Sequence, residues 1–294
     1  MADTLTDNEI RSSLPKETKD IYSKYMESFY FLQPRKRRQA NQLTLLNNLQ
    51  RGDENIAATT LLTLFNRVMS NLYDDKMQIK FVPNEELEQK QVQTLNVLAQ
   101  NDYQQMNMKQ HDYDWTWDTL FFGRGYIETL RFNKVQKIME PSVINPLAFG
   151  YDPFFDDPQK WRYYWKWIIK SSHEINKLIK AGIIKGIKDA KEIPSGVDPF
   201  LWTYKVIRER AKFVTPQAAD TYKGDIHQIL EFYGYNNVGE KCVYWLDKNF
   251  SKLLYYAVLD LKDGDEIIGP GNQVVKQSSR WPIIVKEAFR EPHS

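Results

Sequence analysis

Two glycines flank an arginine in "WDTLFFGRGYIETLRF", residues 117–132, and a glycine cluster of this kind can hold a phosphate. A dinucleotide-binding loop carries its glycines after a strand and before a helix, because the pyrophosphate binds at the helix N-terminus. Here the predicted helix comes first, and the lysine of a nucleotide-binding phosphate loop is missing. We therefore predict structural turns: Gly123 ends the helix in a left-handed conformation, and Gly125 eases the start of the strand. "GPGNQ", residues 269–273, fails the same test and is also predicted to be a turn.

The other residue types capable of catalysis or metal binding lack partners at suitable spacing. The four histidines lie far apart, and His111 is predicted to be a surface residue because no ligand pattern accompanies it. Asp152, Asp156 and Asp157 lack the spacing of a calcium loop and are predicted to form turns. Cys242 has no neighbouring histidine that would activate it as a nucleophile. We predict no catalytic, cofactor-binding or metal-binding residues, and a protein that is not an enzyme.

Four consecutive basic residues, Arg35, Lys36, Arg37 and Arg38, are candidates for contact with DNA phosphates. Pro34 precedes them and interrupts a helical pattern, which indicates an arm or a pair of helices on a surface. A net charge of only +2 excludes a protein-wide positive field, so any contact with DNA would be local. Two interpretations stay open: a solvated helix end, which is the commoner case, or a phosphate contact.

The segment "WRYYWKWIIKSS" has the period-two alternation of a β-strand. Tyr163, Trp165 and Trp167 would lie on one face, with Lys166 and Lys170 on the other. One interpretation is a nucleic-acid-binding module in which this aromatic face stacks on bases beside the lysines. The alternative, which we favour, is a strand packed on a core or on a neighbouring subunit.

Composition places the chain among globular proteins of a reducing compartment. Apolar residues make up 42% and aromatic residues 14%, and the single cysteine excludes an internal disulfide framework. No stretch resembles a signal peptide or approaches the apolar length that a bilayer requires. We expect a soluble protein that is made in the cytoplasm and has no membrane contact.

Hydrophobic periodicity and caps predict an α+β fold. The capping box of Ser171 and Glu174 starts a helix that Gly182 ends. A second helix starts at Asp198. The C-terminal part is β-rich, with strand-like runs from residue 226 onward. Helices are predicted at residues 59–74, 84–107, up to Phe122, 172–181, and 198 to about 215. Strands are predicted at residues 76–83, 126–132, 134–141 and 161–170, with a loop at 143–160.

The order of these segments resembles the wing and stem region of tailed-bacteriophage portal proteins. The similarity runs through "LFNRVMSNLYD", "MQIKFVP", "WDTLFFGRGYIET" and "VINPLAFGYDPFFDDPQKWRYYWKWIIKSSHEI". The closing "SSRWPIIVKEAFREPHS" is similar to the end of the clip module of that family. Each motif is weak alone, and their common order from about Ile56 onward carries the resemblance.

The resemblance implies a helical wing and stem with strand pairs, followed by a β-rich clip. It divides the chain into an N-terminal arm with the basic cluster at residues 1–55, a wing at 56–197, a stem helix and linker at 198–225, and a clip at 226–294. Portal proteins form homo-oligomeric rings, typically dodecamers, at one vertex of the capsid in the virion. Double-stranded DNA passes through the ring during genome packaging and ejection.

The partners implied by the resemblance are the terminase large subunit, head-completion or adaptor proteins, and the major capsid or scaffolding protein. Portal proteins also continue past the clip with a returning stem helix, a tunnel loop, and further wing and crown helices. This sequence stops at Ser294. We therefore expect it to be a piece of a longer chain.

Overall fold

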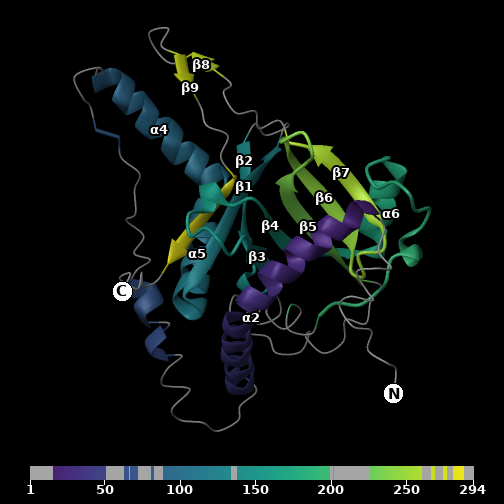
Figure 1. The fold of residues 1–294 in the computed structure, drawn as a ribbon. Helices are drawn as coiled ribbons and strands as arrows, with labels where there is room; N and C mark the ends of the chain where they lie inside the picture. Colours follow the sequence, from purple (N-terminus) through teal and green to yellow (C-terminus); the bar gives the residue numbers. More distant parts are fainter. Residues whose placement is uncertain are drawn as a thin grey trace. The chain divides into compact units, whose positions relative to one another are not determined.

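The computed structural model describes residues 16–50, 63–65, 67–71, 81–82, 89–133, 138–198, 201, 226–259, 266–268, 274–276 and 281–287. Helices and antiparallel sheets together confirm the α+β prediction (Figure 1). The chain forms two compact units. The first comprises Met1–Leu43 and Leu147–Trp281, and the second comprises Thr44–Pro146 and Pro282–Ser294.

The first unit is built on a five-stranded antiparallel sheet with the order β3-β4-β5-β6-β7. Its strands are β3 (Phe149–Tyr151), β4 (Tyr164–Ser171), β5 (Ile226–Tyr235), β6 (Lys241–Asp247) and β7 (Leu253–Val258). The central pair, β4 and β5, joins segments far apart in sequence, with Trp165 opposite Phe232. On the edge strand β3, Gly150 leaves room for the Trp165 indole, because a Cβ there would lie 2.2 Å from the ring.

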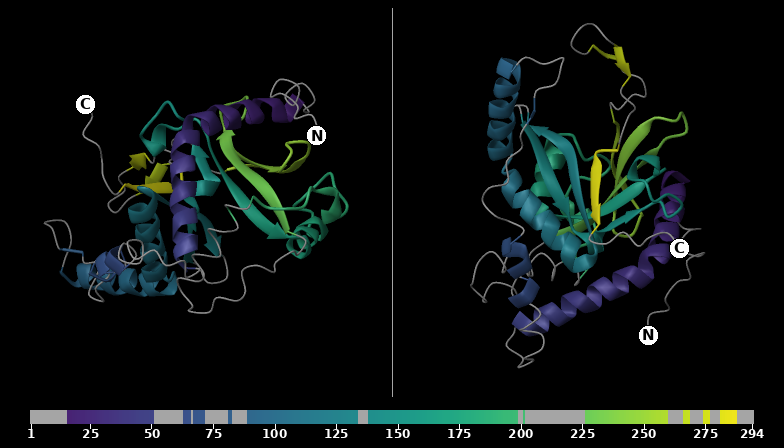
Figure 2. Two further views of the ribbon diagram at one scale, coloured as in Figure 1. Left: turned by 90° about the horizontal axis from the view of Figure 1, so that it is seen from below. Right: turned by 90° about the vertical axis from the view of Figure 1, so that its left-hand side faces the viewer.

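A long helix, α2 (Lys16–Gln50), contributes its residues up to Leu43 to the first unit and packs against one face of this sheet. Ile21 and Tyr22 of α2 join a core cluster with Trp165, Phe232 and other apolar sheet residues. The predicted break at Pro34 is wrong, because α2 continues through the proline. Proline removes one backbone hydrogen bond and crowds the preceding turn, so the helix bends instead of ending. The bend is visible in Figures 1 and 2.

Local signals predicted the helix that follows β4 correctly. In α6 (Ser172–Lys180), the Ser171 hydroxyl accepts from the Glu174 backbone, and the Glu174 carboxylate accepts from Ser171, so the predicted capping box is present. Gly182 then adopts a φ of 70°, as expected for the residue that ends a helix. Ile175 of α6 packs with Ile229 and Leu254 of the sheet in a second apolar cluster.

The second unit packs helices on a three-stranded antiparallel sheet with the order β10-β1-β2. Its elements are α4 (Gln89–Gln105), α5 (Met108–Phe122), β1 (Arg124–Asn133), β2 (Ile138–Ile144) and β10 (Ile283–Glu287). The predicted pair of strands after Gly125 is confirmed, and β1 also pairs with β10 from the end of the sequence. Residues 63–65 and 67–71 are helical, in agreement with the helix predicted there, and Met69 is buried.

Three predicted segments differ from the structure or lie outside its described part. Residues 81–82 are not in a strand, although the pattern at 76–83 predicted one; residues 76–80 lie outside the described part. The predicted loop at 143–160 contains β3, because pairing with β4 stabilises a strand that its Pro, Gly and Asp content does not reveal. The predicted stem helix lies outside the described residues except at Leu201, which is helical.

The two units do not follow the predicted wing and clip boundaries. Strands β3 and β4 from the predicted wing share one sheet with β5, β6 and β7 from the predicted clip. Strand β10 from the predicted clip belongs to the other unit, where it pairs with β1. Strands β8 (Glu266–Ile268) and β9 (Val274–Lys276) form the ribbon on either side of "GPGNQ". Strand-like runs were predicted from residue 226 onward, but β10 was not predicted as a strand. Their distribution over two sheets depends on pairing that local patterns do not specify.

Candidate functional site

The "GRG" segment is a corner between α5 and β1, as predicted. Gly123 follows the last residue of α5 with a φ of 81°, and open space surrounds the position of a Cβ. Gly125 has a different role from the one predicted. A Cβ at Gly125 would lie 2.6 Å from the Trp115 carbonyl oxygen and 2.4 Å from the Thr119 hydroxyl. The missing side chain therefore allows β1 to approach α5 closely.

Arg124, between the two glycines, forms an ion pair with Glu287 of β10. This contact is cross-strand, since Arg124 and Glu287 are opposite each other in the β1–β10 register. The arginine is therefore engaged within the sheet. The geometry supports the architectural interpretation of the segment.

The four basic residues of the predicted DNA contact do not share one surface. All lie within α2, where consecutive side chains point in different directions. Lys36 turns inward, and its Nζ donates to the Leu147 carbonyl at 2.9 Å and lies 4.3 Å from the centroid of the Trp165 ring. Arg35 is partly buried, whereas Arg37 and Arg38 are exposed. The structure thus leaves two arginines of the predicted cluster fully available to a partner.

Burial lowers the pKa of Lys36 to about 7, and the nearby charge of Arg35 lowers it further, while Asp198 opposes the shift weakly. The amine therefore changes its charge near neutral pH. The Trp165 π-face and one carbonyl favour the protonated form but do not replace its hydration.

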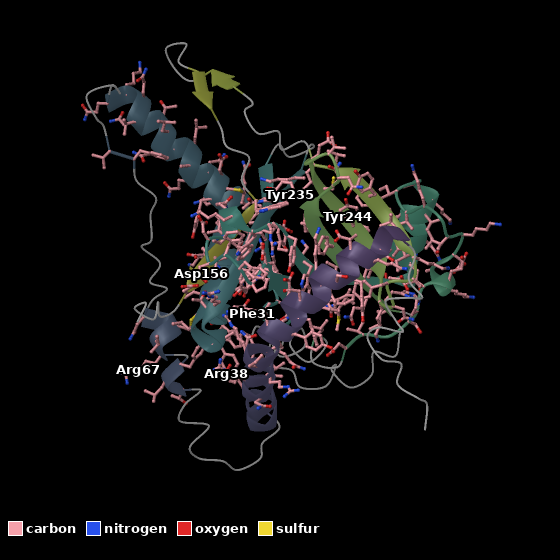
Figure 3. All side chains as sticks on the ribbon, in the orientation of Figure 1. Phe31, Arg38, Arg67, Asp156, Tyr235 and Tyr244 are labelled. Atoms are coloured by element: carbon pink, nitrogen blue, oxygen red, sulfur yellow. The ribbon has the colours of Figure 1, made fainter. Side chains whose placement is uncertain are left out.

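Arg37 and Arg38 belong to an exposed face of α2 that we call the outer stripe. Its members recur at helical spacing: Glu27, Tyr30, Phe31, Pro34, Arg37 and Arg38. Phe31 is 59% exposed and Tyr30 is 52% exposed. Figure 3 labels Phe31 and Arg38 on either side of the bend. The stripe combines two large aromatic side chains with two cations.

The aromatic face of β4 is covered by α2. Trp165 is completely buried, Tyr163 is 1% exposed, and the Tyr25 ring of α2 lies 4.7 Å from the Trp165 ring. Trp167 also contacts Tyr25, and the Tyr163 hydroxyl donates to Glu27 at 2.8 Å. The structure therefore agrees with the core-packing interpretation of this strand, because stacking on bases would require α2 to leave the sheet.

Asp152 organises the loop between β3 and β4. This buried carboxylate accepts from the Phe154 amide, from the Arg162 amide, and from the Arg162 guanidinium at 2.6 Å and 2.9 Å. Asp157 accepts from the Gln159 amide and caps a short 3-10 helix. The predicted turn-forming role is confirmed for both residues. Asp156 is exposed, and Figure 3 labels it.

Asp152→Ala is expected to destabilise the first unit by about 2 kcal/mol, because several hydrogen-bond donors lose their acceptor. Burial alone would raise the pKa of Asp152, but the hydrogen bonds from Arg162 and Phe154 outweigh it and lower the pKa. Its stabilising effect is therefore present at neutral pH and lost as the pH falls through the folded-state pKa. Urea unfolding at neutral pH measures the loss. Asp156→Ala is the control, and equal effects of the two variants would contradict the role of Asp152.

A buried ionic pair on the other face of the sheet was missed by the sequence reasoning. Lys166 of β4 lies 3.6 Å from Glu231 of β5, and the Tyr233 hydroxyl donates to the other carboxylate oxygen. Lys166 and Glu231 are opposite each other in the register. The available signal was one lysine and one glutamate inside two apolar strand-like runs, but only the pairing of β4 with β5 shows that they meet.

His227 was also left without a role by the sequence reasoning. It is buried, its Nε2 lies 2.8 Å from the Ser172 hydroxyl, and its Nδ1 lies 3.3 Å from the Pro194 carbonyl. Since a carbonyl only accepts, Nδ1 is the donor to Pro194, and a neutral ring then accepts from the Ser172 hydroxyl at Nε2. The ring joins α6 and a following loop to β5. His111, on α5, is partly buried, so its prediction as a surface residue is only partly correct.

Within the described ranges, no group of three or more His, Cys, Asp or Glu side chains is arranged to hold a metal ion. Cys242 is buried in β6, with its Sγ 3.4 Å from the Tyr256 hydroxyl. The described helices include none with the length and apolar character needed to cross a bilayer.

No protein-family model and no curated protein sequence matches the chain.

Proposed function

We propose that this chain is a non-enzymatic structural subunit of a portal-type homo-oligomeric ring, which conducts double-stranded DNA through one capsid vertex of a virion. The order of the sequence motifs supports this proposal. The main structural support for the proposal is an apolar surface of α4 that is exposed in the single chain. Terminase, head-completion proteins and the capsid or scaffolding shell would be the other partners of such a ring.

Helix α4 of the second unit buries one of its residues, Val92, among those the structure describes. Leu95 and Leu98, which are three residues apart and therefore share one face of the helix, are 37% and 52% exposed. The Asn96 side chain holds the backbone of Phe81 beside this helix, and Phe81 is also exposed. A helix of 17 residues is marginal in water without packing, and contiguous exposed apolar side chains mark contact surfaces. A neighbouring subunit would cover this surface.

The experiment that tests the proposal is the native mass of the purified chain, measured by light scattering, with negative-stain images of the same fraction. We expect closed rings of about a dozen copies, the number typical of portal proteins, because a head-to-tail contact forms a ring when its rotation divides a full turn. A strict monomer across the accessible concentration range would count against the proposal.

Leu95→Asp/Leu98→Asp is expected to reduce the assembled mass toward that of the monomer, because it places two charges in the contact and would raise the dissociation constant at least about tenfold. Gln93→Asp/Gln100→Asp adds the same charge to exposed polar positions of the same helix and should leave the mass unchanged. If both double variants assemble like the natural chain, α4 is not a subunit contact.

A further inference from the structure

A second exposed feature of the first unit has chemistry that matches the outer stripe of α2. Four consecutive residues in the loop between β3 and β4 form what we call the aromatic tip: Phe154, Phe155, Asp156 and Asp157. Phe154 is 66% exposed, and Phe155 is 38% exposed. The tip thus presents two aromatic rings beside two carboxylates, whereas the stripe presents two aromatic rings beside two guanidinium groups.

Hydrogen bonds at the base of the aromatic tip fix its backbone. Asp152 fixes its first turn through the Phe154 amide and Arg162. The Trp161 indole donates to the Phe155 carbonyl at 2.7 Å. A loop whose backbone is already fixed by hydrogen bonds loses less conformational entropy on binding, and aromatic side chains are enriched at protein interfaces. Exposed aromatic rings on a loop that is anchored by hydrogen bonds are therefore suited to inserting into a partner.

The Phe154 ring of the tip already contacts one guanidinium group, that of Arg162. Arg162 lies with its Cζ 4.9 Å from the centroid of the Phe154 ring. Arginine stacks on aromatic faces and pairs with carboxylates through the same planar group. Arg37 and Arg38 of the stripe carry the groups that the exposed part of the tip would bind. Among the residues that the structure describes, no ion pair involves Arg37, Arg38, Asp156 or Asp157.

We infer that the outer stripe of α2 in one copy of the chain binds the aromatic tip of a second copy. The inference rests on the proposed ring and names one of its subunit contacts. Because one copy contributes a helix face and the other a loop, the contact is heterologous and can repeat from subunit to subunit. The paired charges would set the register, and the aromatic side chains would supply buried apolar area.

DNA is a weaker candidate for the partner of the outer stripe. Two exposed arginines would neutralise about two phosphates, which gives a salt dependence and an affinity far below those of DNA-binding proteins. A carboxylate-bearing protein loop fits a short stripe with two cations better than a continuous line of phosphates does.

A charge exchange on the full chain tests the inference. The stripe variant is Arg37→Glu/Arg38→Glu, and the tip variant is Asp156→Lys/Asp157→Asn, in which asparagine still caps the 3-10 helix. Each variant alone should lose most of its assembled mass, because like charges would face each other. An equimolar mixture of the two variants should regain the assembled mass of the natural chain. In the mixture, the acidic stripe of one variant can bind the basic tip of the other. Lys191→Glu/Lys248→Glu, at exposed positions of the same unit, is the control for a change in net charge.

The outcomes separate the inference from the proposed ring. If the natural chain assembles and both variants keep its mass, or if the mixture does not regain mass, the inference is wrong and the ring stands. A natural chain that stays monomeric overturns both. If the stripe variant assembles normally but loses affinity for a labelled duplex in an anisotropy titration, DNA is the partner of the stripe and the inference is wrong. Far-ultraviolet circular dichroism of each variant checks its folding.

Discussion

Gly125→Ala is expected to destabilise the second unit by about 2–3 kcal/mol, because a methyl group at this position overlaps the backbone of the preceding helix. The Trp115 carbonyl oxygen would lie 2.6 Å from the new carbon, and it cannot move without displacing α5. The flexible end of a side chain could turn away, but a helix backbone could not. Urea unfolding, followed by tryptophan fluorescence, measures the loss as a lower midpoint at an unchanged slope.

Gly123→Ala is the matched variant two residues earlier. Open space surrounds that position, so the alanine meets only the cost of a left-handed backbone, about 1 kcal/mol. We therefore expect Gly125→Ala to be clearly the more harmful of the two substitutions. The opposite order would mean that helix termination, and not the close approach of β1 to α5, is what this corner requires.

The free energy of unfolding is expected to rise by about 2 kcal/mol between pH 7 and pH 9 because of Lys36. In the folded chain, burial lowers the pKa of this lysine from its ordinary value of 10.5 to about 7. Between these two values the unfolded chain binds a proton that the folded chain does not, so raising the pH favours folding. Burial also raises the pKa of Tyr25 to about 12, which acts in the opposite direction above about pH 10. The comparison therefore ends at pH 9.

Lys36→Met is expected to stabilise the chain by about 1–4 kcal/mol at pH 7 and to remove most of the rise with pH. Methionine keeps an unbranched apolar side chain against Trp165 and removes the buried charge. Lys160→Met, at an exposed position of the same unit, should retain the rise. Denaturation curves at pH 7 and pH 9 for the three chains provide the comparison. A rise that persists in Lys36→Met would mean that another group titrates.

Elements whose signals are local were predicted well from the sequence. The capping box at Ser171, the end of α5 at Gly123 and the alternation of β4 depend on neighbouring residues, so a short segment contains the whole signal. Pro34 shows the limit of such signals. Tertiary packing of α2 on the sheet offsets the hydrogen bond that proline removes, and the helix continues.

The candidate site was predicted less well, because its meaning depends on which way each side chain points. Four consecutive basic residues predict one positive patch, but the helix turns Lys36 toward Trp165 and the Leu147 carbonyl and leaves Arg37 and Arg38 outside. The aromatic tip was interpreted only as a turn. Its conformation depends on the pairing of the buried Asp152 carboxylate with Arg162, which the sequence does not reveal.

By itself, the sequence determined the α+β class, most helix and strand identities, and the structural roles of Gly123, Asp152 and Asp157, because each is encoded within a few neighbouring residues. Only the tertiary structure decided which strands share a sheet, that α2 covers the aromatic face of β4, and that Lys166 meets Glu231. These arrangements depend on pairing between distant segments. Many registers satisfy the same local patterns, and the burial of side chains from both partners selects among them.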